Sequence, residues 1–138
     1  MVLYAGSDAP LPRIAWDPGA PAFHVADLDE AVAPVRSHFA HPHVAYVGSH
    51  EGCGCGFQLG EHAGFEDPED VSRKRATLAR LADYLDLRLD EGCSIAIYAC
   101  WSGDESQSPE HRRTLTTHDL RGESFWFLER ELSAVVRP

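Results

Sequence analysis

The segment CSIAIYACW, at residues 93–101, most strongly constrains how this chain can fold. It is apolar on both of the faces that a strand would present: Ile95, Ile97, Ala99 and Trp101 on one, and Ala96, Tyr98 and Cys100 on the other. A strand with one face in water alternates apolar and polar residues, and this segment does not. We therefore expect residues 94–101 to form a central strand of a sheet.

Residues 67–92 predict a long surface helix. Asp67 is a typical N-cap residue, Pro68 would occupy the first helical position, and Gly92 would follow the last turn. Apolar residues recur at helical spacing and would form the buried stripe, which comprises Val71, Leu78, Leu81, Leu85 and Leu89. Two outward ion pairs are also predicted, Glu69 with Arg73 and Asp70 with Lys74.

The N-terminal part of the chain predicts a strand, an irregular segment and a shorter helix. The strand covers about residues 1–5, and the four prolines within residues 9–23 exclude a regular element there. Helical spacing of apolar residues, with Asp27 as N-cap, predicts a helix over residues 27–39. Pro34 would either bend this helix or make it start late.

Three further segments favour strands. Residues 43–49 are rich in β-branched and aromatic side chains, and residues 57–60 could return antiparallel to them after a glycine-rich turn. Residues 112–116 predict a short strand. The tail, residues 125–136, fits both a helix and a strand, and its aromatic run and terminal valines favour the strand.

The order of these elements predicts an α+β fold, a two-layer split βαβ (ferredoxin-like) sandwich with an extra C-terminal strand pair. That pair, a hairpin from residues 112–136, would lie beside residues 94–101 and bury them. If residues 57–60 do not pair as a strand, the long helix would instead join two parallel strands in a small open α/β sheet. The composition does not shift along the chain, so we expect residues 1–138 to form a single domain.

The net charge and the cysteine content restrict the classes of binding partner and the cellular compartment that we expect. The net charge of −10 and the scattered basic residues argue against nucleic acid as a partner. Without a signal peptide or an apolar run of about 20 residues, we expect a soluble cytoplasmic protein with no membrane partner. The four cysteines are then expected to be free thiols, metal ligands or redox groups. The oligomeric state, including a homo-oligomer, stays open.

The most unusual stretch is VGSHEGCGCGF, at residues 47–57, in which Gly52, Gly54 and Gly56 alternate with Cys53 and Cys55. Three hypotheses fit it. In the first, which the sequence favours over the other two, the glycines serve a tight turn and the cysteines act as small buried apolar residues. In the second the turn binds a metal, and in the third it carries thiol chemistry.

The metal hypothesis is limited by strand geometry. Cys93 and Cys100 are seven residues apart, which separates them by roughly 23 Å on one strand, so they cannot share an ion. The predicted zinc site therefore combines Cys53 and Cys55 with one of those two, and Cys93 is the preferred third ligand. His50 or His62 would complete it. Zinc is the only cofactor that the sequence suggests.

The thiol hypothesis uses the same turn differently. Its backbone amides could form an anion-binding nest that lowers the pKa of Cys53 or Cys55, with His50 as the base and Glu51 beside it. In the open α/β sheet the strand ends would bring Asp8, His50, Cys53 and Asp104 together. In the split βαβ fold, Cys93 would face the turn instead.

Two functions remain open from the sequence. We favour a non-enzymatic domain that binds a small molecule, a protein partner, an anion or a metal through the Gly-Cys-Gly-Cys-Gly turn. The residues expected to contact the ligand are Gly52, Gly54, Gly56, Trp101 and Asp104. The alternative is a small thiol-dependent redox or transfer enzyme that uses Cys53 and Cys55 with His50 and Glu51, for which the sequence shows no established catalytic spacing.

Overall fold

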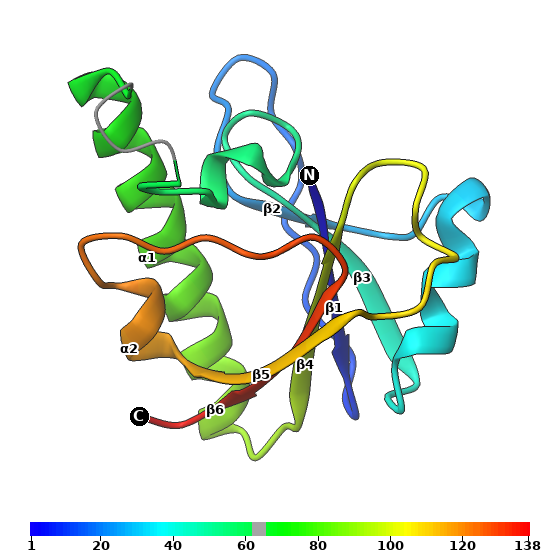
Figure 1. The fold of residues 1–138 in the computed structure, drawn as a ribbon. Helices are drawn as coiled ribbons and strands as arrows, with labels where there is room; N and C mark the ends of the chain where they lie inside the picture. The colour runs from blue at the N-terminus through cyan, green and yellow to red at the C-terminus, as the bar shows by residue number, and fades with distance from the viewer. Residues whose placement is uncertain (62–65) are drawn as a thin grey trace.

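The computed structural model describes residues 1–61 and 66–138 and is a mixed α+β structure built on one six-stranded sheet (Figure 1). Its strands are β1 (Val2–Ser7), β2 (His24–Ala26), β3 (His43–Gly48), β4 (Ile95–Cys100), β5 (His111–Thr116) and β6 (Glu131–Val136). The helices are the 3-10 helices η1 (Glu30–His38) and η2 (Gly54–Phe57) and the α-helices α1 (Pro68–Asp90) and α2 (Thr117–Leu120). The strands lie in the order β2-β3-β1-β4-β6-β5.

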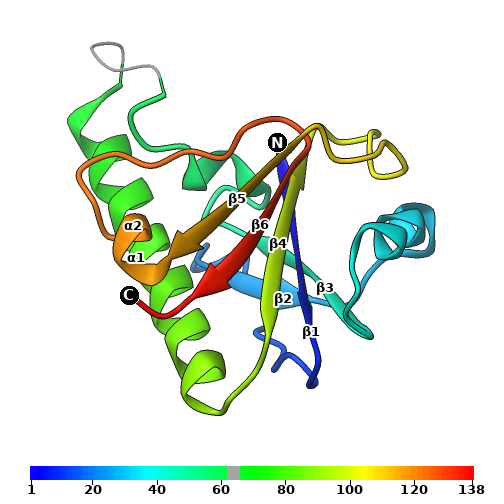
Figure 2. The same ribbon diagram turned by 60° about the horizontal axis from the view of Figure 1, so that its bottom comes forward.

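Strand β4 lies inside the sheet, as its sequence predicts. It pairs with β1 on one side and β6 on the other, and all six of its residues are buried. Ile95, Ile97 and Ala99 belong to the main core beneath α1, whereas Tyr98 and Cys100 belong to a second cluster on the opposite face. Figure 2 shows the sheet between these two layers, with α1 and α2 on one side and η1 on the other.

Helix α1 confirms the predicted capping and the buried stripe. The Asp67 side chain accepts a hydrogen bond from the Glu69 N–H, Pro68 begins the helix, and Gly92 has a φ of 84° just beyond it. The leucines of the stripe lie in the main core, and Val71 packs against its edge. Among the described residues, none of the helices combines the length and the apolar composition needed to cross a membrane.

The second face of the sheet is covered by η1. Its N-cap is Asp29 rather than the predicted Asp27, and Pro34 lies inside the helix, which is a 3-10 helix. Val35 is fully buried against Tyr4, Val44, Tyr98 and Cys100. The predicted two-layer sandwich is therefore incomplete, because this face also carries a helical layer.

The predicted split βαβ topology is wrong in its strand pairing. That unit needs the strands on either side of its first helix to be parallel, with another strand between them. Here β1 and β3 pair directly and antiparallel. The reason is β2, a three-residue strand that the sequence does not reveal. The proline-rich segment carries the chain back along the sheet to β2, so β3 enters from the end at which β1 finishes.

The alternative, a small open α/β sheet, is right about the long helix. Helix α1 joins β3 to β4, and these strands run parallel to each other because both are antiparallel to β1. The sheet itself is not an open parallel one, because β1 lies between β3 and β4 and the only hydrogen-bonded parallel pair among the described residues is β5 with β6. These strands form the predicted C-terminal pair beside β4, but not as a hairpin. Helix α2 and residues 121–130 return the chain so that β6 runs parallel to β5 (Figure 2). The strand prediction for the tail is confirmed over Glu131–Val136.

Residues 57–60 do not form the predicted return strand. Leu59 instead makes an isolated antiparallel bridge with Phe125. The Gln58 side chain extends this pairing, since its amide donates to the Phe127 carbonyl at 2.8 Å and accepts from the Phe127 N–H at 2.8 Å. Residues 57–60 therefore pair with the segment that precedes β6 and not with β3.

The two faces of α1 give a direct test of this packing. Leu85 is fully buried and Leu87 is 58% exposed, although both belong to the same helix. We predict that Leu85→Ala lowers the free energy of unfolding by about 2–5 kcal/mol, because it leaves a cavity in the core. Leu87→Ala should change it by less than about 0.5 kcal/mol. Urea denaturation of both variants checks this, and equal losses would contradict the assigned faces.

Candidate functional site

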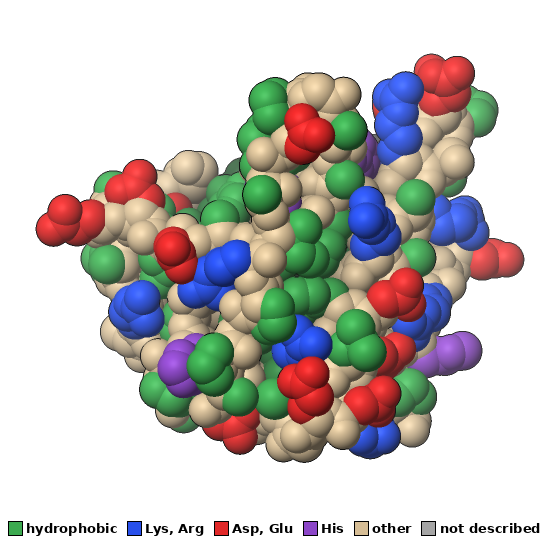
Figure 3. Space-filling model, turned by 180° about the vertical axis from the view of Figure 1, so that it is seen from behind, with side chains coloured by type: hydrophobic (Ala, Val, Ile, Leu, Met, Phe, Trp, Pro, Cys, Tyr) green, Lys and Arg blue, Asp and Glu red, His purple; other side chains and the backbone are tan. Residues whose placement is uncertain are grey.

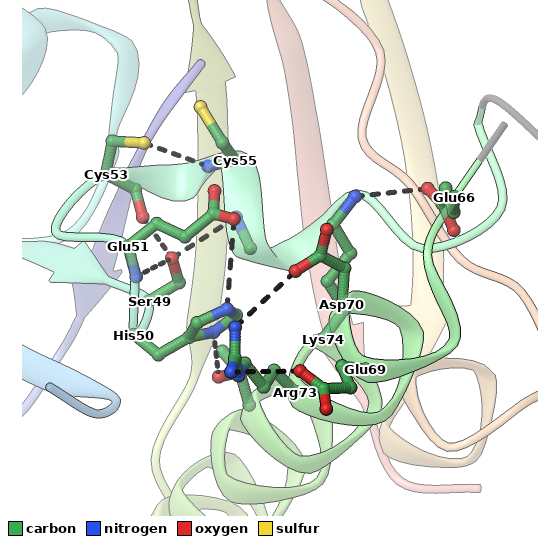
Figure 4. A network of polar contacts seen from close by, with 12 residues as sticks. Ser49, His50, Glu51, Cys53, Cys55, Glu66, Glu69, Asp70, Arg73 and Lys74 are labelled. Carbon is green, nitrogen blue, oxygen red and sulfur yellow. Dashed lines mark hydrogen bonds and ion pairs between the residues drawn. The ribbon is translucent and has the colours of Figure 1, made fainter.

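The segment of residues 49–56 follows β3 and is held in shape by one hydroxyl group (Figure 4). Ser49 is fully buried, and its Oγ donates to the Cys53 carbonyl at 2.6 Å. The same oxygen accepts from the N–H groups of Glu51, at 3.1 Å, and Gly56, at 3.2 Å. A further bond from the Gly54 N–H to the Met1 carbonyl ties the segment to β1. We call residues 49–56 the thiol loop.

The three glycines of the thiol loop are required by its geometry. Gly52 has a φ of 84°, in the left-handed region that favours glycine. A Cβ atom on Gly54 would lie 2.8 Å from Leu3 Cδ1, and one on Gly56 would lie 2.5 Å from Ser49 Oγ. Their N–H groups all bond to partners within the protein. These amides therefore do not form the open anion-binding nest that the sequence suggested.

Two thiols and one carboxylate converge on the outside of this loop. One carboxylate oxygen of Glu51 and the sulfur atoms of Cys53 and Cys55 all lie within 4.8 Å of one another. The Cys55 N–H donates to Cys53 Sγ at 3.4 Å, which fixes the orientation of that thiol. Both cysteines are partly exposed, and Glu51 is exposed. This group could hold a metal ion.

Cys53 lies in surroundings that favour the neutral form of its thiol. Burial raises the pKa of the Cys53 thiol above its ordinary value, and its hydrogen bond with Cys55 raises it further. The Cys55 N–H acts in the opposite direction but does not reverse the shift. Without a bound cation, Cys53 is therefore a weaker nucleophile at neutral pH than an ordinary cysteine.

His50 points away from the thiols and toward α1. Its Nδ1 lies 2.7 Å from Thr77 Oγ1, and its Nε2 lies 3.9 Å from Glu51 Oε1. Burial lowers the pKa of this imidazole below its ordinary value, although Glu51 opposes the shift. Figure 4 shows Glu51 between the thiols on one side and His50 on the other. His50 does not belong to the group of converging ligand atoms.

The structure does not bring the other predicted ligands to the thiol loop. Cys93 precedes β4, and the N–H of the next residue, Ser94, donates a hydrogen bond to the carboxylate of Asp8. The thiol loop packs against Met1, at the other end of β1, roughly 20 Å away along the strand. Asp8 is likewise separated from the loop. His62 lies outside the described residues.

Cys100 is near the loop end of the sheet but points into the second cluster. It is fully buried there, and burial raises the pKa of its thiol to about 12, with Glu105 adding to the shift. Trp101 is 52% exposed and, with Glu51 and Cys55, lines a small cavity of about 190 Å³. Asp104 lies in the turn after Trp101 and is not among the converging ligand atoms.

Several residues of the site were not predicted from the sequence. The sequence does not indicate the role of Ser49, because nothing in its spacing shows that one hydroxyl bonds three backbone groups. For Glu51 it suggests a place beside a catalytic base and not a role as a ligand. Lys74 is predicted to pair outward with Asp70, but it bonds Glu66 at 3.1 Å and lines the cavity of Trp101. Asp70 pairs with Arg73 instead, and the predicted pair of Glu69 and Arg73 is confirmed.

Comparison with known proteins finds no matching family model, no matching curated protein and no matching solved structure. The functional inference therefore depends on the geometry of the site.

The role of Ser49 can be tested by removing its hydroxyl. We predict that Ser49→Ala lowers the free energy of unfolding by about 1–3 kcal/mol, because the Gly56 N–H is then left buried without a partner. Ser72→Ala is the matched control, since Ser72 is exposed on α1 and alanine favours helices. Urea denaturation gives both values. A Ser49→Ala variant as stable as the control would show that the loop does not need this hydroxyl.

Proposed function

We propose that this protein is a metal-binding domain and that the thiol loop holds zinc through Glu51, Cys53 and Cys55. The observation that carries the proposal is the convergence of these three ligand atoms within 4.8 Å of one another. Zinc at the centre of such a group needs bonds of about 2.0–2.3 Å, which small side-chain rotations would provide. The backbone would not have to move, because Ser49 already fixes it.

The donor set favours zinc over other common metals. Thiolates are soft ligands that select zinc or copper(I), whereas magnesium and calcium prefer sites made only of oxygen ligands. The added carboxylate of Glu51 suits zinc, which accepts sulfur and oxygen ligands together. Three protein ligands leave one position of a tetrahedral ion for water or for an atom of a small-molecule or protein partner.

The same geometry supports binding rather than thiol catalysis. A catalytic thiol needs a base within hydrogen-bonding distance, and the nearest imidazole, His50, is directed to Thr77. The raised pKa of Cys53 also disfavours a free thiolate. We therefore retain the non-enzymatic function. Because the ligands must stay reduced, we assign the protein to the cytoplasm.

The proposal is tested by a zinc competition titration against a chromophoric chelator. We expect the wild-type protein to bind one zinc ion per chain. Cys53→Ser and Cys55→Ser should each weaken binding by at least about tenfold, because a hydroxyl is a much poorer zinc ligand than a thiolate. Cys93→Ser is the matched control and should bind zinc like the wild type, since Cys93 lies at the other end of the sheet.

The pH dependence gives an independent check. The pKa of Cys53 is raised in the folded protein, so zinc must displace a proton from its thiol at neutral pH. Zinc affinity should therefore rise with pH, by about tenfold per unit for each proton released. Equal zinc affinity in all three cysteine variants, or affinity that does not change between about pH 6 and 8, would contradict the proposal.

A further inference from the structure

A larger cavity lies on the other side of Glu51 from the thiols. It has a volume of about 600 Å³ and lies between α1 and the end of the proline-rich segment. Small-molecule sites commonly have volumes of about 300–1,000 Å³, so it could hold a compact organic ligand. Figure 3 shows this side of the molecule, with Lys and Arg side chains along α1 beside the hollow. We call it the α1 cavity.

The floor of the α1 cavity is apolar and fixed. Pro21, Ala22, Phe23 and Ala76 contribute to its lining. Phe23 is only 4% exposed, and its ring packs edge-on against Phe57 and Tyr84, with centroids 6.4 Å and 5.5 Å away. Such a surface favours the apolar body of a ligand, because burying it removes apolar area from water.

The rim of the α1 cavity carries two arginines on one stripe of the helix. Arg73 and Arg80 are seven residues apart, which places them about 10 Å apart along the axis, with Thr77 between them. Arg73 makes only long contacts of 3.6 Å with Glu69 and Asp70. Arg80 forms no ion pair within residues 1–61 and 66–138.

The lining of the α1 cavity has more basic than acidic side chains, unlike the chain as a whole. The protein has 22 acidic and 12 basic residues, whereas the described lining includes two arginines and a single carboxylate, Glu51. The carboxylates of Glu69 and Asp70 contact Arg73 from outside this lining. Two guanidinium groups above an apolar floor match a ligand with an anionic head and an apolar body. His50, held by Thr77, adds a polar group to the same wall.

We propose that the α1 cavity binds a small organic anion with an apolar body, held by Arg73 and Arg80 at its head and by Phe23 beneath it. The site is distinct from the metal group, although Glu51 borders both. The proposal does not depend on bound zinc, because the arginines and the apolar floor do not take part in the metal group.

The test is a titration followed by ¹⁵N–¹H correlation spectra, with three probes of matched chemistry. Phenyl phosphate combines both features, inorganic phosphate lacks the apolar body, and benzyl alcohol lacks the charge. We expect phenyl phosphate to shift the signals of residues 21–23, 50–51 and 73–80 saturably. Its dissociation constant should be at least about tenfold below those of the other two probes.

Arg80→Gln should weaken phenyl phosphate binding by about tenfold, which corresponds to one charge-assisted contact. Arg36→Gln is the matched control and should leave it unchanged, since Arg36 is an exposed arginine on η1, across the sheet. No saturable shift up to about 10 mM phenyl phosphate, equally tight inorganic phosphate, or equal binding by both variants would overturn the proposal. Titration with and without a metal chelator separates this result from that for zinc, because both should give the same constant.

Discussion

The burial of β4 on both faces is the constraint on which the rest of this structure depends. A strand whose six residues are all buried needs a neighbour on each edge and a layer on each face. Strands β1 and β6 provide the edges, and α1 and η1 provide the layers. With both faces occupied, the thiol loop lies at the end of the sheet, where β3 finishes and β1 begins.

At that end, two neighbouring residues connect two different surfaces. Glu51 joins the sulfur atoms of Cys53 and Cys55, whereas His50 turns to Thr77 and lines the α1 cavity. Their positions depend on Ser49, because its buried hydroxyl fixes the backbone on both sides of them. A rigid loop suits metal binding, since ligands that are already in place lose little conformational entropy when the ion binds.

Local patterns in the sequence predict some of these features. Features that depend on contacts between residues far apart in the chain are not predicted. Capping residues and the helical spacing of apolar residues predict helix α1. Apolar residues on both faces predict the central strand β4. Strand β2 has three residues, too few for a periodic signal, and missing it gave β3 the wrong direction. That error placed Cys93 beside the turn. Within the turn, short chain separation kept Cys53, Cys55 and Glu51 together whatever the topology.

The most direct measurement of the central claim is the absorption spectrum of the protein with cobalt(II), which occupies zinc sites and reports its ligands. If Cys53 and Cys55 bind the ion together with Glu51, the spectrum should show intense thiolate-to-cobalt charge transfer and visible bands of tetrahedral cobalt. Both should be absent from a Cys53→Ser/Cys55→Ser double variant. A wild-type spectrum with neither feature, like that of cobalt in water, would contradict the assignment of the thiol loop as a metal site.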